Sequence, residues 1–256
     1  MIPKVIHYCW FGGNPLPKYA SECIQTWRKL MPDFEIKEWN EQNFDVNSIP
    51  YTREAYAAKK YAFVSDYARF WILYHYGGVY FDTDVRMVKS LYHIIEKGPF
   101  MGFEQPDEVD KQSKDAFYCV APGLGIGVDA HNAFYAELLR FYQQRHFVDE
   151  NGNNDMTTVV QFTTDLLMEQ GLLPNNQLQQ VAGIWIYPWD YFCPQSFYTK
   201  KMNPSANTVS IHLYSESWNP LLAILKRKFC RMLGDQMSSR LVRVKRKTLS
   251  WMRRKS

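Results

Sequence analysis

Short apolar runs near the start of the chain alternate with a longer segment of mixed polarity. Residues Val5–Phe11 form an apolar run that stops at Gly12-Gly13-Asn14-Pro15, which is typical of a buried strand followed by a loop. Residues Phe34–Trp39 alternate apolar and polar positions, and this period of two predicts a second strand. Between them, residues Pro17–Leu30 favour a helix that ends before Pro32. The N-terminal part therefore predicts a strand, a helix and a strand.

A helical segment follows and leads into a third strand. Residues Thr52–Tyr76 contain no Gly or Pro, so they predict one long helix, or two in succession, closed by Gly77. Residues Val79–Phe81 then form a short strand that ends at Asp82. The same patterns predict later strands at Pro99–Phe103 and Ile184–Pro188, and helices at Ala133–Phe147 and about Asp155–Gln170.

This alternation predicts an α/β fold with a mostly parallel central sheet flanked by helices. In such sheets, ligands bind outside the carboxyl ends of the strands. Both Trp10-Phe11-Gly12 and Asp82-Thr83-Asp84 fall at predicted carboxyl ends. The length of 256 residues and the hydrophobic content of 46% fit one large globular domain, which we place at residues 1–220.

The cysteines and the apolar runs indicate a protein of a reducing compartment. Five cysteines are scattered without C-x-x-C spacing, which argues against a disulfide framework or a zinc site. The N-terminus reads as a strand rather than a signal peptide, and no run of about 18 apolar residues is present. We therefore expect a cytoplasmic protein without a membrane span.

The charge is distributed very unevenly along the chain. Residues 226–256 contain 12 basic residues and one acidic residue, a net charge of +11, which leaves −7 for the rest out of a total of +4. Residues 221–256 interleave these charges with apolar and aromatic side chains, as in a basic helical tail. A solvated or disordered tail is one interpretation. The mixture of basic and aromatic side chains favours the other, in which the tail binds the anionic inner face of a membrane, so we expect peripheral association with that surface. Nucleic acid is not expected as a partner, because the body is acidic and contains no nucleic-acid module.

The two aspartates after the third strand are the first candidate for chemistry. Asp82 and Asp84 lie one residue apart, and two adjacent carboxylates can hold a divalent cation that keeps open positions for phosphate oxygens. A surface turn with two acids is the alternative. The preceding Gly77-Gly78 and the aromatic strand favour a rigid site.

Four further residues have both a structural and a functional interpretation. Asp66 and Arg69 share a helical face, where they form either an ordinary ion pair or part of the site. Trp10 is either a core residue or a stacking face for a base. His212 is either a core histidine, a third ligand of the cation or a contact to a diphosphate, with the indole N–H of Trp218 as a further donor.

Together these motifs resemble family 32 of the glycosyltransferases, the sugar transferases with a DXD-containing region. The resemblance rests on Ile2–Gly13, on Ser65–Arg69 and on Tyr74–Asp84, with a weaker similarity at His212–Trp218. The family includes yeast mannosyltransferases and bacterial capsule enzymes, and clostridial toxin glucosyltransferases are more distant relatives. The resemblance implies a GT-A fold, a nucleotide-sugar donor, a glycan or lipid-linked acceptor, retention of anomeric configuration, and Mn²⁺ or Mg²⁺ as cofactor.

The resemblance also implies a role for each candidate residue. Asp66 and Arg69 would hold the donor sugar and the leaving phosphate, and Asp84 would ligate the cation. The remaining roles are base stacking by Trp10, contact of Asp82 with the donor and the cation, and closure over the cation and the diphosphate by His212, Ser217 and Trp218.

Two other functions remain open at this stage. The strand followed by Asp82-Thr83-Asp84-Val85 also fits a haloacid-dehalogenase-like phosphatase, although neither Gly127-Val128-Asp129 nor Gly234-Asp235 supplies the later acidic pair that such enzymes need. A non-catalytic protein that binds a sugar nucleotide or a glycan is the other. The sequence leaves open which nucleotide and which sugar are used, with UDP-sugars favoured.

Overall fold

The computed structural model describes residues 1–106, 117–197 and 199–215. Its centre is a seven-stranded sheet in the order β2-β1-β3-β6-β5-β8-β7. The strands are β1 (Val5–Cys9), β2 (Glu35–Trp39), β3 (Gly78–Tyr80), β5 (Phe100–Gly102), β6 (Ile126–Val128), β7 (Gln179–Val181) and β8 (Ile184–Tyr187). A second sheet pairs β4 (Val85–Met87) with β9 (Ser210–His212).

The predicted mostly parallel sheet is confirmed in the direction of its strands. β2, β1, β3, β5 and β8 run one way, while β6 and β7 run the other way. The antiparallel β6 lies between β3 and β5, so neither of these strands pairs with a parallel neighbour on that side. The carboxyl ends of the five codirectional strands share one edge of the sheet.

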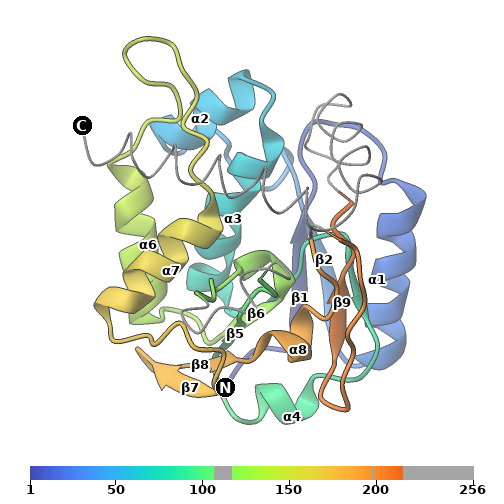
Figure 1. The fold of residues 1–256 in the computed structure, drawn as a ribbon. Helices are drawn as coiled ribbons and strands as arrows, with labels where there is room; N and C mark the ends of the chain where they lie inside the picture. The colour runs from blue at the N-terminus through green and yellow to red at the C-terminus, as the bar shows by residue number, and fades with distance from the viewer. Residues whose placement is uncertain (107–116, 198, 216–256) are drawn as a thin grey trace.

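Helices cover both faces of the sheet (Figure 1). They are α1 (Lys18–Leu30), α2 (Pro50–Ala57), α3 (Tyr61–Tyr76), α4 (Tyr92–Ile95), η1 (Pro122–Leu124), α6 (Ala133–Gln143), α7 (Val159–Glu169) and α8 (Trp189–Phe192). α2, α3, α6 and α7 gather on one side, and α1 lies on the other. The helices predicted from residues 17–30, 52–76, 133–147 and 155–170 are all present, with the third and fourth shorter than expected.

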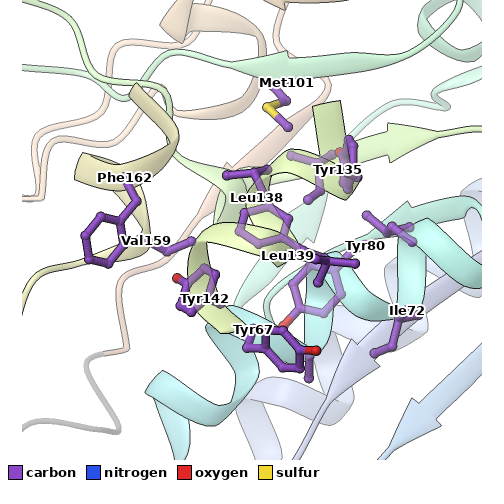
Figure 2. Packing of buried hydrophobic residues seen from close by; sticks show 14 of the residues in the cluster. Tyr67, Ile72, Tyr80, Met101, Tyr135, Leu138, Leu139, Tyr142, Val159 and Phe162 are labelled. Carbon is purple, nitrogen blue, oxygen red and sulfur yellow. The ribbon is translucent and has the colours of Figure 1, made fainter. Parts of the chain in front are cut away.

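Aromatic side chains fill the layer between the sheet and helices α3, α6 and α7. Figure 2 shows Tyr67, Tyr80, Tyr135 and Tyr142 packed with Leu138, and all of these side chains are buried. The rings meet at steep angles, as at Tyr67–Tyr142, where the centroids are 5.8 Å apart and the planes are inclined at 61°. Edge-to-face contacts of this kind are favourable beyond simple area burial. These aromatic side chains therefore have a structural role in the core of the protein.

Two glycines make the turn from α3 into β3 possible. Gly77 has φ +64°, and an added Cβ would lie 2.8 Å from the backbone nitrogen of Ala130. Gly78 has φ +101°, and its Cβ would lie 2.8 Å from the carbonyl oxygen of Val5. Both the left-handed backbone and the close approach to neighbouring chain segments require glycine. The predicted glycine closure of the helix is confirmed, and it places β3 directly against β1.

A buried histidine joins the first three strands at this turn. His7 accepts a hydrogen bond at Nδ1 from the indole N–H of Trp39 at 3.1 Å, and its Nε2 donates to the carbonyl oxygen of Gly77 at 3.0 Å. Burial lowers the pKa of His7 from 6.5 to about 4. The ring is therefore neutral in the folded protein at neutral pH, and it fixes β1, β2 and the end of α3 to one another.

This histidine predicts a specific dependence of stability on pH. Because the unfolded chain binds a proton at His7 below about pH 6.5 and the folded chain does so only near pH 4, stability is fully present above pH 6.5 and decreases as the pH falls towards 4. Between pH 7.5 and 4.5 the loss amounts to about 2–3 kcal/mol. We expect the destabilisation caused by His7→Gln to be smaller at pH 4.5 than at pH 7.5 by that amount, measured by urea unfolding. An equal destabilisation at both pH values would contradict the assignment.

Candidate functional site

The carboxyl ends of β1 and β3 bring the first two motifs to the same edge of the sheet. Trp10 directly follows β1 and Asp82 lies two residues after β3, and the two strands pair in parallel. The Trp10 side chain is half-buried, and its indole N–H donates to the carbonyl oxygen of Asn14 at 2.6 Å. The chain turns at Asp82, whose carbonyl oxygen accepts from the N–H of Val85. The expected juxtaposition at the strand ends is confirmed.

A buried arginine connects the helical motif to the aspartate pair. Arg69 Nη2 lies 2.8 Å from Asp66 Oδ1 and 3.3 Å from Asp82 Oδ1, and its side chain is only 4% exposed. Its Nε–H also donates to the carbonyl oxygen of Ser65. The Asp66–Arg69 pair is therefore not a solvent-exposed helical ion pair. It forms a buried carboxylate–guanidinium–carboxylate bridge, in which loss of one partner would leave an uncompensated charge.

Two residues that the sequence analysis did not select also hold Asp82. The Tyr80 hydroxyl donates to Asp82 Oδ1 at 3.0 Å, and the Tyr80 ring lies 5.0 Å from the guanidinium carbon of Arg69. On the other side, a Cβ added to Gly123 would lie 2.1 Å from Asp82 Oδ2. Tyr80 could have been found, because residues two apart in a strand lie on the same face. Gly123 carries no such local signal.

The second aspartate meets the histidine from the far end of the described chain. β4 and β9 pair antiparallel with Val85 opposite His212, and this register places His212 Nε2 3.3 Å from Asp84 Oδ1 and 3.9 Å from Asp82 Oδ2. The other oxygen of Asp84 accepts the backbone N–H of Ser215 at 2.7 Å. The structure therefore brings together Asp66, Arg69, Asp82, Asp84 and His212, whereas Ser217 and Trp218 lie outside the described residues.

The ionisation of these groups follows from their mutual contacts. Burial would raise the pKa of Asp82, but Arg69 and His212 outweigh it and lower the pKa. Burial would lower the pKa of His212, but the carboxylates of Asp84 and Asp82 raise it. Asp66 differs, because burial raises its pKa to about 7 despite the opposing effect of Arg69. One side of Arg69 thus faces a firmly ionised carboxylate, and the other a carboxylate that titrates near neutral pH.

The aspartate pair and His212 suit part of a cation's coordination shell. Their oxygen and nitrogen atoms lie 3.3–3.9 Å apart, a spacing that small side-chain shifts can adapt to a common ion. Within residues 1–106, 117–197 and 199–215, no group of three or more His, Cys, Asp or Glu side chains is arranged so that it could hold a metal ion. A cation bound by the two aspartates would take its remaining ligands from phosphate oxygens and water.

The ring of His212 is oriented by the chain that follows it. The N–H of Tyr214 points at His212 Nδ1 at 3.2 Å, so the proton of the neutral ring lies on Nε2, which faces both aspartates. In this state His212 donates hydrogen bonds. It can bind a cation through Nε2 only after this proton has left the ring.

The comparisons with known proteins point to sugar transfer. Residues 17–101 match the family model described as "Glycosyltransferase sugar-binding region containing DXD motif". Inositol phosphoceramide mannosyltransferase 1 of Schizosaccharomyces pombe is 31% identical over 111 residues, which are 39% of this chain and 33% of that protein. Uncharacterized glycosyltransferase L373 of Acanthamoeba polyphaga mimivirus is 26% identical over 238 residues, 88% of this chain and 87% of that protein.

The chain thus spans only about a third of the length of the fission-yeast mannosyltransferase. Among solved structures, the PaToxG glycosyltransferase has a TM-score of 0.45 at 19% identity, covering 66% of this chain and 69% of that one. The family model covers Ser65–Arg69 and Tyr74–Asp84, two of the motifs on which the resemblance was based, whereas Ile2–Gly13 precedes the matched region. Residues 17–101 of this chain therefore match the DXD-containing sugar-binding region of glycosyltransferases, in agreement with the resemblance.

Proposed function

We propose that this protein is a metal-dependent retaining glycosyltransferase that moves a hexose from a nucleotide diphosphate sugar, with UDP as the favoured nucleotide. The observation that supports this most strongly is the buried Asp66–Arg69–Asp82 bridge next to the Asp84–His212 pair, at the carboxyl edge of the sheet. All but His212 lie within the region that matches the glycosyltransferase model. The family match also favours sugar transfer over the phosphatase alternative.

In this proposal, Asp84 and Asp82 hold Mn²⁺ or Mg²⁺. When bound, the cation neutralises the negative charge that develops on the departing diphosphate. Asp84 presents Oδ1 towards His212, while its Oδ2 is fixed by the N–H of Ser215, so the carboxylate cannot rotate freely. His212 either joins the ligands after losing its Nε2 proton or donates that N–H to the diphosphate.

In this proposal, Arg69 interacts with the leaving phosphate and Asp66 with the donor sugar, the two groups that the breaking bond joins. The guanidinium supplies a fixed positive charge near the leaving phosphate, in a site where low exposure strengthens the attraction. An ionised Asp66 favours the oxocarbenium-like sugar. We propose attack of the acceptor on the same face of the sugar, with the departing phosphate taking the acceptor's proton.

The donor nucleotide would lie at the end of β1, with Trp10 stacked on its base. The turn after Trp10 is tight, because the N–H of Gly12 donates to Glu41 Oε1 at 2.6 Å and a Cβ on Gly12 would lie 2.4 Å from the Tyr61 ring. Ser217 and Trp218, which we propose to close over the diphosphate, follow the described residues.

We further propose a glycan or lipid-linked glycan acceptor in surface polysaccharide synthesis. The name of the fission-yeast relative, an inositol phosphoceramide mannosyltransferase, describes action on a lipid. No helix among the described residues is long and apolar enough to cross a membrane. The basic segment at residues 221–256 would bring the enzyme to the anionic inner face of the membrane, where such an acceptor is displayed.

Donor hydrolysis provides the direct test of the reaction. With Mn²⁺ and a panel of UDP- and GDP-sugars, we expect slow release of the nucleotide from one donor. The release should fall at least about 100-fold in Asp84→Asn, because one cation ligand is lost, and should stop with EDTA. The exposed Asp45→Asn serves as a matched control and should release nucleotide at the wild-type rate. Metal-dependent binding without turnover would instead support the non-catalytic alternative.

The raised pKa of Asp66 predicts the acid side of the pH profile. Since the ionised carboxylate is the active form, kcat/KM should fall tenfold per pH unit below about pH 7. Asp66→Asn should reduce kcat by roughly 10²–10³-fold and abolish this dependence. Steady-state kinetics from pH 5.5 to 8.5 measure both quantities. An unchanged acid limb in Asp66→Asn would assign the titration to another group.

The tail is tested separately with lipid vesicles. The triple variant Lys245→Gln, Arg246→Gln and Lys247→Gln should bind vesicles of 30% phosphatidylserine roughly 100-fold more weakly than the wild type, at about 1 kcal/mol per basic residue. Sedimentation with the vesicles at low salt measures the partition coefficient. Vesicles of phosphatidylcholine alone should retain neither protein. Equal retention of both proteins by anionic vesicles would contradict the proposed membrane role.

A further inference from the structure

Tyr214 occupies a backbone conformation that is unusual for an aromatic residue. It lies two residues after His212, where β9 ends, and has φ +50°. The left-handed region is unfavourable for a bulky side chain, so the surrounding contacts must hold the residue there. The contacts of Tyr214 therefore explain why the chain accepts it.

The side chain of Tyr214 is bound at both ends. Its hydroxyl donates to Glu104 Oε1 at 2.8 Å, and the sulfur of Cys193 lies 2.9 Å from the same hydroxyl oxygen. Its ring lies against the His212 ring, with centroids 4.2 Å apart. The phenol thus reaches from His212 to two residues on other elements.

The backbone around Tyr214 contacts the aspartate that we propose as a cation ligand. The N–H of Leu213 donates to the carbonyl oxygen of Asp84 at 2.9 Å, and the N–H of Ser215 donates to Asp84 Oδ2 at 2.7 Å. The N–H of Tyr214 itself points at His212 Nδ1. Both Asp84 and His212 are therefore oriented by three consecutive backbone N–H groups, and that of Ser215 follows the left-handed turn at Tyr214.

The phenol contacts connect this turn to the other half of the sheet. Glu104 lies two residues beyond β5, and Cys193 directly follows α8, which is joined to the end of β8. Asp84, by contrast, follows β3. Tyr214 thus links the segment that follows β9 to the carboxyl ends of β5 and β8, and the bond to Glu104 spans 110 positions in sequence.

We propose that Tyr214 is a positioning residue, which holds Asp84 and His212 in the geometry required for a cation–diphosphate pair. This inference rests on the proposed function, because it assigns a structural cause to the geometry of that site. Tyr214 itself touches neither the cation nor the donor in this proposal. The hydroxyl of Tyr214 holds its ring in place, and this ring together with the N–H of Tyr214 orients His212. The backbone N–H groups of Leu213 and Ser215 orient Asp84.

The test is binding of UDP with Mn²⁺ by titration calorimetry, together with the Mn²⁺ concentration that gives half-maximal donor hydrolysis. Tyr214→Phe keeps the ring on His212 and removes both hydroxyl contacts. We expect it to weaken Mn²⁺-dependent UDP binding roughly tenfold. It should raise the Mn²⁺ requirement by a similar factor, while kcat at saturating Mn²⁺ stays within about twofold of wild type. A purely structural role would instead lower kcat and thermal stability together.

Two controls separate the possible outcomes. Tyr135→Phe also removes a buried phenol, but one whose hydroxyl has no hydrogen-bond partner among the described residues, and it should bind UDP like the wild type. Glu104→Ala should weaken Mn²⁺-dependent UDP binding as Tyr214→Phe does. The double variant should bind UDP no more weakly than whichever single variant binds it less well, since both substitutions remove the same hydrogen bond. Additive losses, or wild-type binding by Tyr214→Phe, would overturn the inference. Failure of the wild type to bind UDP with Mn²⁺ would overturn the proposed function instead.

Discussion

The positive charge of Arg69 is buried between two carboxylates, and the arrangement of the site depends on this constraint. A guanidinium with 4% side-chain exposure is tolerable only if its lost hydration is replaced by partners in good geometry. Asp66 comes from the same helix and Asp82 from the turn that follows β3, so the bridge fixes α3 against the end of β3. The glycine turn at Gly77-Gly78 makes this approach sterically possible. The contacts of Arg69 that join α3 to the end of β3 are therefore the same contacts that form the candidate site.

The same bridge makes the two carboxylates chemically different. The carboxylate of Asp82 is contacted by Arg69, Tyr80 and His212, and its pKa is lowered, so it remains ionised. Burial instead raises the pKa of Asp66 to about 7. Asp82 is thereby suited to a cation or a polar donor group. Asp66 is suited to a position beside a sugar carbon that becomes positive. A symmetric pair of exposed acids would not show this division, which arises from the unequal number of donors around each carboxylate.

A second layer of organisation comes from the return of the chain along β9. The pairing of β4 with β9 places His212 opposite Val85, and thereby next to the aspartate that precedes that residue. The left-handed turn at Tyr214 then directs the backbone N–H of Ser215 at Asp84. The site is thus assembled from an N-terminal half that carries the aspartates and a C-terminal segment that contacts and orients them.

The features of the site that depend on spacing between nearby residues could be predicted from the sequence alone. Helix periodicity placed Asp66 and Arg69 on one face, and the glycines after a long helix predicted the entry into the strand that carries Asp82 and Asp84. The position of Trp10 at a strand end followed from an apolar run ended by glycines. These signals lie within a few residues of one another, so no tertiary information was needed. The family motifs added the expected roles, most of which remain proposals.

The contacts between the elements that carry these residues depend on the tertiary structure. Strand β6 and the β4–β9 pair were not predicted, and their antiparallel pairing depends on the order of strands in the folded protein. The contact of Arg69 with Asp82, the approach of Gly123 and the bond from Tyr214 to Glu104 join residues whose proximity depends on strand order. Burial, which sets the pKa of Asp66, is likewise a property of the packed whole, because desolvation depends on every element around the group.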